Sequence, residues 1–394
     1  MNYFDNGKKE LCCGCNGCKE VCPKNCISMI EDNEGFIYPD INLNLCINCN
    51  MCKEVCPMID TKYVFNMNKN IHAYAAFNNN ENIRLNSTSG GIFTELAEYV
   101  LKNNGVIVGA KFDKNMEVVH EFASSREEYE QFRGSKYVRS DIGGIYCRVE
   151  ELLKKDIVVL FVATPCEIAG MKKYLRKDYD NLILCDIICH NNPSPKVFRK
   201  YITYLEQKNN SNVVNIVLRD KEKGWHNPTF KVYFEDKRQF SENYYKNYYI
   251  QGFGMGLFSR PCCHSCQFTG SDRVGHITIG DFWGIDKIDK TMDDNKGTSV
   301  VLLNNSKAEE IFDEIKINLK YKEVDIKSAF KYNHKKPSVP DINRERFFKE
   351  LDGTEFDILI DRYMRTDKLK TKIGKYIPKF IKEKIKKIIL SIKK

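Results

Sequence analysis

The sequence predicts a mixed α/β protein with a small cysteine-rich unit, a two-part α/β body and a C-terminal amphipathic helix. Three observations support this prediction. One cysteine pattern occurs twice before residue 60, apolar runs alternate with helical patterns between residues 70 and 320, and lysines and isoleucines recur at helical spacing near the end. The expected units span residues 1–65, 70–150, 151–330 and 331–394, and the last of them is a linker followed by a basic amphipathic tail.

The first unit contains two copies of the pattern C-x2-C-x2-C-x3-C-P, 34 residues apart. Bacterial ferredoxins with two [4Fe–4S] clusters have this spacing, and the fourth cysteine of each copy binds the cluster of the other copy. Cluster 1 is therefore expected on Cys12, Cys15, Cys18 and Cys56, and cluster 2 on Cys46, Cys49, Cys52 and Cys22. Structural zinc is the alternative, but two full copies with a trailing Cys-Pro favour iron–sulfur. Cys13 and Cys26 lie outside the pattern and are interpreted as small neighbours.

The second unit opens with a strand pattern at residues 72–77. Ser87–Gly91 then precedes an apolar stripe at helical spacing over residues 92–101. Hydroxyls and backbone N–H groups at a helix N-terminus can bind a phosphate, although an N-cap with a turn is the simpler interpretation. The basic loop Arg133–Tyr137 is a second candidate for anion binding.

The third unit begins with a strand at residues 157–163, a helix and a second strand at residues 182–188, which predicts a βαβ unit and a parallel sheet. Cys166 and Cys189 each follow a strand, where open α/β sheets bind ligands. With the downstream C-x2-C of Cys263 and Cys266 they predict a third metal site, iron–sulfur or zinc. Ordinary buried cysteines are the alternative, and Cys262 could replace Cys263 as a ligand.

Composition excludes several classes of protein. The longest apolar run has seven residues, too few to cross a membrane, and the N-terminus has no signal-peptide pattern. We therefore expect a cytoplasmic protein, in which a set of 17 cysteines indicates metal ligands or redox groups and not a disulfide framework; Cys147 and Cys185 fall in apolar patterns and are interpreted as core residues. Residues 366–394 contain eleven Lys, one Asp and one Glu, which accounts for the net charge of +9, so the neutral body gives no nucleic-acid signal. No dinucleotide or P-loop glycine motif is present.

Several segments together resemble the beta subunit family of coenzyme F420 hydrogenase and dehydrogenase. The resemblance covers roughly residues 10–320, and its segments follow the family's order. They are Ser87–Gly91, Arg133–Tyr137, Thr164-Pro165-Cys166, Cys189-His190 and Gly280–Gly284.

The resemblance implies a small ferredoxin-like domain followed by a two-part flavin-binding body, with FAD or FMN as the flavin. It implies a third [4Fe–4S] cluster on Cys166, Cys189, Cys263 and Cys266. The residues implied to contact the flavin are Ser87, Ser89, Gly90, Gly91, Arg133, Ser135, Lys136 and Tyr137.

The activity that the resemblance implies is that of an iron–sulfur flavoprotein oxidoreductase. Electrons would move between clusters and flavin and reach a two-electron carrier or small substrate. That molecule would be an F420-type deazaflavin or a pathway intermediate such as one of surface-polysaccharide synthesis. A redox partner is also implied, ferredoxin-like or a dehydrogenase or hydrogenase subunit. The alternatives are an electron-transfer subunit without its own substrate site and a zinc-stabilised binding scaffold.

Two motifs depart from the family. Its usual Thr-Pro-Cys-Gln ends in Glu167 here, and its usual Cys-His-Gly ends in Asn191. Both positions are expected at the cofactor edge. His190 is the candidate proton donor, because imidazole titrates near neutral pH, and a hydrogen bond to the third cluster is the equal alternative.

The tail generates a prediction about membranes. Pro378 begins a helical pattern of about 25 Å. Its apolar face consists of Phe380, Ile381, Ile385, Ile388, Ile389 and Ile392. A basic helix of this kind lies in the interface of an anionic membrane, here the inner face. The alternatives are that the apolar face packs on the body or on a partner, or that the tail is disordered.

We expect the full chain to float with anionic liposomes and a chain that ends at Thr366 not to float. Equal flotation of both chains, or flotation that does not depend on anionic lipid, would contradict this prediction.

Overall fold

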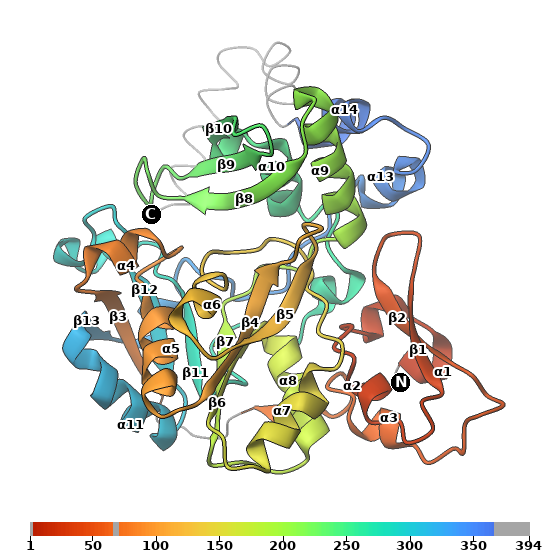
Figure 1. Ribbon diagram of the computed structural model, residues 1–394, viewed down its shortest axis with the longest axis horizontal. Coiled ribbons are helices and arrows are strands. Elements are labelled where there is room, and N and C mark those ends of the chain that lie inside the picture. Colours follow the sequence, from red (N-terminus) through yellow and green to blue (C-terminus); the bar gives the residue numbers. More distant parts are fainter. Residues whose placement is uncertain (1–2, 66–70, 366–394) are drawn as a thin grey trace, which may run out of the picture.

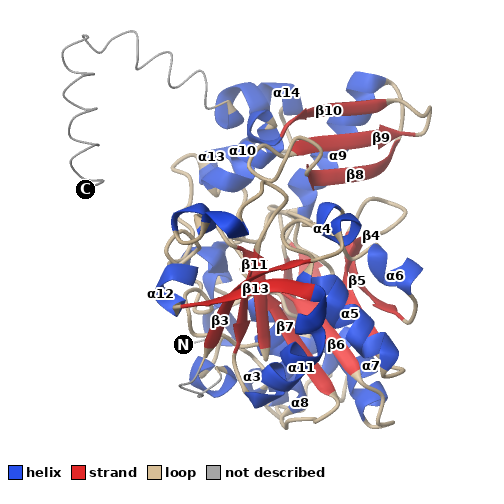
Figure 2. Ribbon diagram, turned by 90° about the vertical axis from the view of Figure 1, so that its left-hand side faces the viewer, coloured by secondary structure: helices blue, strands red, loops and turns tan. Residues whose placement is uncertain are grey.

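The computed structural model describes residues 3–65 and 71–365 (Figure 1). A cysteine-rich N-terminal unit packs against one side of an α/β body, and a smaller lobe with its own sheet lies above one edge of the body's sheet (Figure 2). The helix predicted after Pro378 lies outside the described residues. Within the described residues, no helix has both the length and the apolar composition needed to cross a membrane.

The N-terminal unit contains one hairpin and several short helical turns. Helices α2 (Gly17–Glu20) and α3 (Met51–Glu54) carry the two cysteine motifs, and the antiparallel strands β1 (Ile27–Glu31) and β2 (Ile37–Ile41) connect them. Asn16 and Asn50 precede these helices with φ values of 63° and 60°. The repeat in the sequence is therefore also a repeat of backbone geometry.

Eight strands form the central sheet in the order β13-β3-β12-β11-β7-β6-β4-β5. The pairs β4–β6, β6–β7 and β7–β11 are parallel, as the βαβ pattern predicts, and the outer pairs are antiparallel. The bounds are β3 (His72–Asn78), β4 (Val106–Phe112), β5 (Val118–Ala123), β6 (Val159–Ala163), β7 (Leu182–Ile187), β11 (Ile277–Asp281), β12 (Ser299–Leu303) and β13 (Leu319–Val324). Strands from both predicted units of the body, residues 70–150 and 151–330, thus share one sheet.

Helices cover both faces of this sheet, which explains the continuous apolar runs of its central strands. Helices α5 (Ile92–Lys102) and α11 (Ser306–Ile315) pack on one face, against Ile107, Leu160 and Ile183. Helices α7 (Ile145–Leu153) and α8 (Pro165–Leu175) pack on the other face. Successive residues of one strand therefore pack in the two hydrophobic cores on opposite faces of the sheet.

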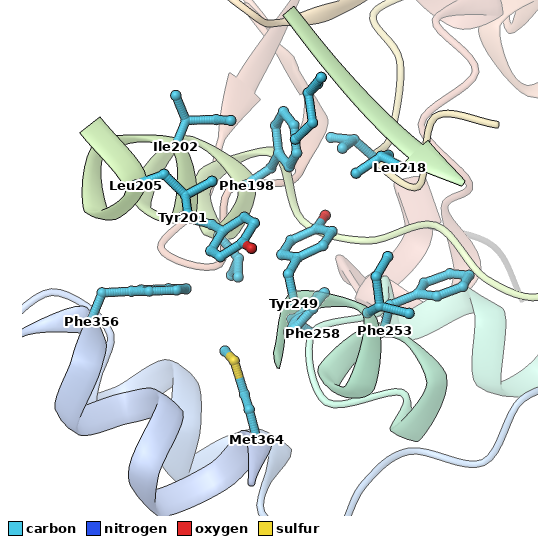
Figure 3. Close-up of a cluster of buried hydrophobic side chains, with 14 of the residues drawn as sticks. Phe198, Tyr201, Ile202, Leu205, Leu218, Tyr249, Phe253, Phe258, Phe356 and Met364 are labelled. Carbon is cyan, nitrogen blue, oxygen red and sulfur yellow. The ribbon is translucent and has the colours of Figure 1, made fainter. Parts of the chain in front are cut away.

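The lobe combines the three-stranded sheet β10-β9-β8 with four helices. The bounds are β8 (Val213–Asp220), β9 (Thr229–Phe234), β10 (Gln239–Asn243), α9 (Pro195–Asn209), α10 (Tyr248–Met255), α13 (Arg344–Glu350) and α14 (Phe356–Leu359). Aromatic side chains from distant segments fill its core (Figure 3), where Tyr201 and Tyr249 stack with ring centroids 5.1 Å apart. This core continues into the body through Met116, Val118 and Val138, and residues 344–364 complete it.

The remaining elements are short helical turns at the surface and in connections. They are α1 (Tyr3–Asn6), η1 (Lys9–Leu11), η2 (Thr61–Val64), α4 (Glu81–Leu85), α6 (Arg126–Glu130), η3 (Tyr244–Lys246), η4 (Pro261–Ser265), η5 (Ile285–Lys287), η6 (Lys290–Met292), η7 (Lys316–Asn318), α12 (Ile326–Ala329) and η8 (Ile360–Met364). The mixed α/β fold predicted from the sequence is confirmed.

A buried ion pair fixes the centre of the sheet. Asp186 in β7 is 0% exposed and accepts hydrogen bonds from Arg273 at 2.7 Å and from the Gly275 N–H at 2.8 Å. Removing one partner of such a pair leaves a buried charge and costs about 3–5 kcal/mol.

We expect Asp186→Asn to lower the thermal unfolding midpoint by several degrees. Asp313→Asn, which breaks the exposed pair with Lys316, is the control and is expected to leave the midpoint nearly unchanged.

Candidate functional site

The cysteines predicted for cluster 2 converge on one cavity. Cys22 comes from the first copy of the motif, and Cys46, Cys49 and Cys52 come from the second, as the crossed pattern requires. The backbone N–H of Asn48 donates to the Cys46 sulfur at 3.4 Å. Cys26, interpreted from the sequence as a small neighbour outside the pattern, also lines this cavity, with its sulfur 3.3 Å from that of Cys22.

The cysteines predicted for cluster 1 lie deeper, between the N-terminal unit and the body. Burial raises the pKa of Cys18, and the nearby Cys12 and Cys56 thiolates raise it further, so the two copies of the motif meet here as well. Cys15 is buried, and its sulfur lies beside Gly170 of α8. The cysteines predicted for cluster 1 thus lie against the body, whereas Cys49, predicted for cluster 2, is exposed.

A third cavity holds all four of the remaining predicted ligands, Cys166, Cys189, Cys263 and Cys266. Cys166 lies in the first turn of α8, Cys189 follows β7, Cys263 lies in η4 and Cys266 directly follows η4. The N–H groups of Asn192 and Phe268 donate to the sulfurs of Cys263 and Cys266 at 3.3 and 3.4 Å. Cys13 and Cys262 line the same cavity, so six thiols surround it.

A much larger cleft of about 680 Å³ lies at the carboxyl ends of β4, β6, β7 and β11. This is the edge at which open α/β sheets bind ligands. The lobe forms the opposite wall through residues such as Arg219, Tyr244 and Phe253. The volume falls within the usual range for small-molecule and cofactor sites.

Most residues predicted to contact a flavin line this cleft. They are Ser87, Ser89, Gly91, Arg133, Ser135, Lys136 and Tyr137, and His190 lines it too. The Ser135 N–H donates to the Thr88 hydroxyl at 2.9 Å, which ties the two predicted segments together. Gly91 has φ 87°, a conformation that favours glycine, and it precedes α5 directly.

Gly90 is the exception, because it does not line the cleft. It is buried beside strands β3 and β12, where an added Cβ would lie 2.4 Å from the Ala76 carbonyl oxygen and 2.8 Å from the Ser299 nitrogen. Gly90 therefore allows two backbones to approach each other. Its effect on the cleft is to position its neighbours Ser89 and Gly91.

The third cavity and the large cleft share one wall, the segment Cys189–Asn192 that follows β7. His190 within it lies with its Nδ1 atom 3.2 Å from Nδ1 of His334, and its ring meets that of Phe253 edge-on. Burial lowers the pKa of His190 and lowers that of His334 to about 4. Both imidazoles are therefore neutral at pH 7.

Two family models match this chain, and both describe the beta subunit of coenzyme F420 hydrogenase/dehydrogenase. The model of its N-terminal part matches residues 73–145, and the model of its C-terminal part matches residues 157–329. The chain belongs to this beta subunit family. Membership assigns it to the oxidoreductases that transfer electrons, as an enzyme or as a subunit of one. The family is one that binds iron–sulfur clusters and flavin.

One solved structure similar to this chain belongs to the F420-reducing [NiFe] hydrogenase complex of Methanosarcina barkeri, studied as a xenon derivative. The two chains are 18% identical with a TM-score of 0.45, and the similarity covers 74% of this chain and 91% of the other. The comparison with curated proteins gives no match. The family models begin after the N-terminal unit, and His334 lies beyond their end.

The structure explains why the family's Thr-Pro-Cys-Gln motif can end in Glu167 instead of glutamine. The carboxylate pairs with the buried Arg139 at 2.7 Å and accepts hydrogen bonds from the Thr164 N–H and hydroxyl at 2.9 and 2.7 Å. Arg139 holds the pKa of this buried carboxyl below its usual value, against the effect of desolvation. The second terminal nitrogen of Arg139, Nη2, donates to the Gly14 carbonyl at 2.7 Å. The exchanged residue thus connects the cleft wall to the N-terminal unit.

Several cleft residues were missed by the sequence analysis. Arg219 pairs with Asp281 at 2.5 Å, and the Trp225 indole N–H donates to the same carboxylate at 2.8 Å. This arrangement fixes Trp283, which stacks on Trp225 with centroids 4.9 Å apart. No sequence motif includes Arg219, because its partner Asp281 lies 62 residues away in the chain. His334 lies in a segment that the sequence suggested was a linker.

Proposed function

We propose that the protein is an iron–sulfur flavoprotein oxidoreductase with three [4Fe–4S] clusters and one flavin, FAD or FMN. The observation that supports this best is the shared wall Cys189–Asn192, because it separates a cavity of six thiols from a cleft of flavin size by one short segment. When bound, the clusters would carry single electrons, and the flavin would combine two of them for hydride transfer. The acceptor would be a two-electron carrier such as an F420-type deazaflavin, or a small pathway intermediate.

The donor chemistry at the cysteine sites favours clusters over zinc. Within residues 3–65 and 71–365, no group of three or more His, Cys, Asp or Glu side chains is spaced to hold a single metal ion. Each thiolate of a cubane binds a different iron atom, so its ligands lie farther apart than the ligands of one zinc ion. Backbone N–H groups directed at sulfur, as in Cys46, Cys263 and Cys266, suit ligands that carry negative charge.

The cleft residues would bind and orient a flavin. The Lys136 ammonium donates to the carbonyls of Gln131 and Arg133 at 2.9 and 2.7 Å, so two of its three donors hold the loop and one is left for a ligand. This remaining donor would bind a phosphate of the flavin. Ser87 and Ser89 line the same cleft and hold its wall, because their hydroxyls donate to the carbonyls of Ile83 and Thr298 at 2.7 and 2.8 Å. His190 and His334 would share a hydrogen bond between their Nδ1 atoms, and the neutral pair would deliver a proton to the cleft after taking one up from solvent.

The exposed side of cluster 2 would receive electrons from a redox partner protein. Large apolar side chains in the loop that leads to the second cysteine motif are more than half exposed. They are Leu43, Leu45 and Ile47. Ile47 also lines the cluster 2 cavity. Electron-transfer contacts between proteins are typically small and transient, and such a patch is sufficient for one.

The cluster count tests the proposal. Protein purified without oxygen is expected to contain about twelve irons, matching sulfide and one flavin. Changing Cys263→Ser and Cys266→Ser together should remove about four irons, because two thiolates of the third cluster are lost. Cys147→Ser, outside all three sites, is the control. Unchanged iron in the double variant would exclude the third cluster, and if Cys263→Ser alone has no effect, Cys262 is the ligand.

The flavin site should depend on pH. Desolvation lowers the pKa of Lys136 to about 7, so the side chain is protonated below pH 7 and neutral above it. An anionic flavin phosphate prefers the protonated form, so the affinity for FAD or FMN should fall by about tenfold from pH 6 to pH 9. Lys136→Arg stays charged and should bind with little pH dependence. Identical pH profiles for wild type and Lys136→Gln would show that Lys136 does not contact the phosphate.

A further inference from the structure

The two copies of the cysteine repeat build nearly the same local site. Gly14 occupies the position in the first copy that Asn48 occupies in the second, and both have positive φ, 71° and 54°. In each copy the N–H of that residue points at the first cysteine sulfur, Cys12 or Cys46. Sequence and local backbone alone therefore predict two clusters with similar properties.

Tertiary structure makes the two sites different through Arg260. This side chain is 0% exposed and belongs to the body, directly before η4, which contains Cys263 and is followed by Cys266. Its Nε donates to the Cys12 carbonyl at 2.9 Å, and its Nη2 lies 3.6 Å from the Cys12 sulfur and 2.8 Å from the Ile37 carbonyl. The Tyr38 ring covers the guanidinium at 4.3 Å.

The charge of Arg260 is not neutralised by a carboxylate. In the part of the chain that the structure describes, Arg260 takes part in no ion pair, whereas Arg139 and Arg344, which are also buried at this boundary, pair with Glu167 and Glu34. The Nη1 atom of Arg260 is buried without a hydrogen-bond partner. The negative charge that balances this cation must come from the site that it faces.

Gly14 makes this contact possible. A Cβ at Gly14 would lie 2.9 Å from Nη1 of Arg260, so the glycine lets the loop pack against the guanidinium. The second copy has the side chain of Asn48 at this place. Within the described residues, no arginine or lysine donates to Cys46, Cys49 or Cys52, and Cys49 is exposed to solvent.

We propose that Arg260 is a positioning residue that raises the reduction potential of cluster 1 and leaves that of cluster 2 unchanged. This inference rests on the proposed function, because it requires both clusters. Reduction adds one electron and no proton to a site that already holds four thiolates. A buried cation with an N–H directed at sulfur stabilises the more negative, reduced form. Arg260 thereby favours an electron at cluster 1, beside the third cavity, over one at the exposed cluster 2.

Redox titration of the full-length protein, followed by EPR, tests this. Cys49→Ser disturbs cluster 2 alone and so assigns the signals. Arg260→Gln should lower the equilibrium constant for reduction of cluster 1 at least tenfold, which is about 59 mV for a one-electron couple. Arg260→Lys keeps the charge and should give a smaller shift. The cluster 2 signal serves as the internal reference and should not move.

Arg344→Gln is the matched control. Arg344 is also buried and joins the two units, through Glu34 at 2.5 Å and the Ser259 carbonyl at 3.0 Å, but it does not contact Cys12. It should leave both potentials unchanged. An unchanged cluster 1 potential in Arg260→Gln at full iron content would refute the proposal, as would equal shifts of both clusters. Loss of four irons in both Arg260 variants would also refute it, because Arg260 would then serve assembly. A wild-type protein without reducible clusters would instead refute the proposed function itself.

Discussion

The parallel pairing of β6, β7 and β11 is the constraint on which the rest of the structure depends. Parallel strands end at the same edge of a sheet, so the segments that follow them must meet there. Here the segment after β6 carries Cys166, and the segment after β7 carries Cys189 and His190. Because Cys189–Asn192 faces a thiol-lined cavity on one side and the large cleft on the other, one short loop belongs to two sites.

Side chains of the body contact the N-terminal unit, and a side chain of that unit contacts the body, so the unit is held at this edge. Arg139 and Arg260 from the body reach the backbone of the first cysteine loop, and Glu20 in return accepts hydrogen bonds from the N–H groups of Gly144 and Cys147 at the start of α7. A carboxylate at a helix N-terminus and guanidinium groups on loop carbonyls each satisfy polar groups that docking would otherwise bury unpaired. The unit is therefore fixed in orientation, with the cysteines predicted for cluster 1 facing inward.

The lobe gives the cleft its second wall without contributing to the central sheet. Its aromatic core, built around Tyr201 and Tyr249, fixes Phe253, which packs on both Tyr137 and His190 at the cleft. The segment containing His334 adds a second imidazole to the same place. The polar lining of the cleft therefore comes from at least three separate regions of the chain, which suits a site that must hold a cofactor and admit a second molecule.

The sequence by itself determined the features that are local. Cysteine spacing specifies which thiols share a site, and the apolar periodicity of β6, α8 and β7 specifies a βαβ unit, because both depend on neighbours within a few residues. Only tertiary structure decided the rest. It placed Cys13 and Cys262 in the third cavity, gave Gly90 a packing role outside the cleft, paired Glu167 with Arg139 and set Arg260 against Cys12. Each of these contacts joins residues that are distant in the chain, and a buried charge or thiol acquires its partner only when the two surfaces close over it.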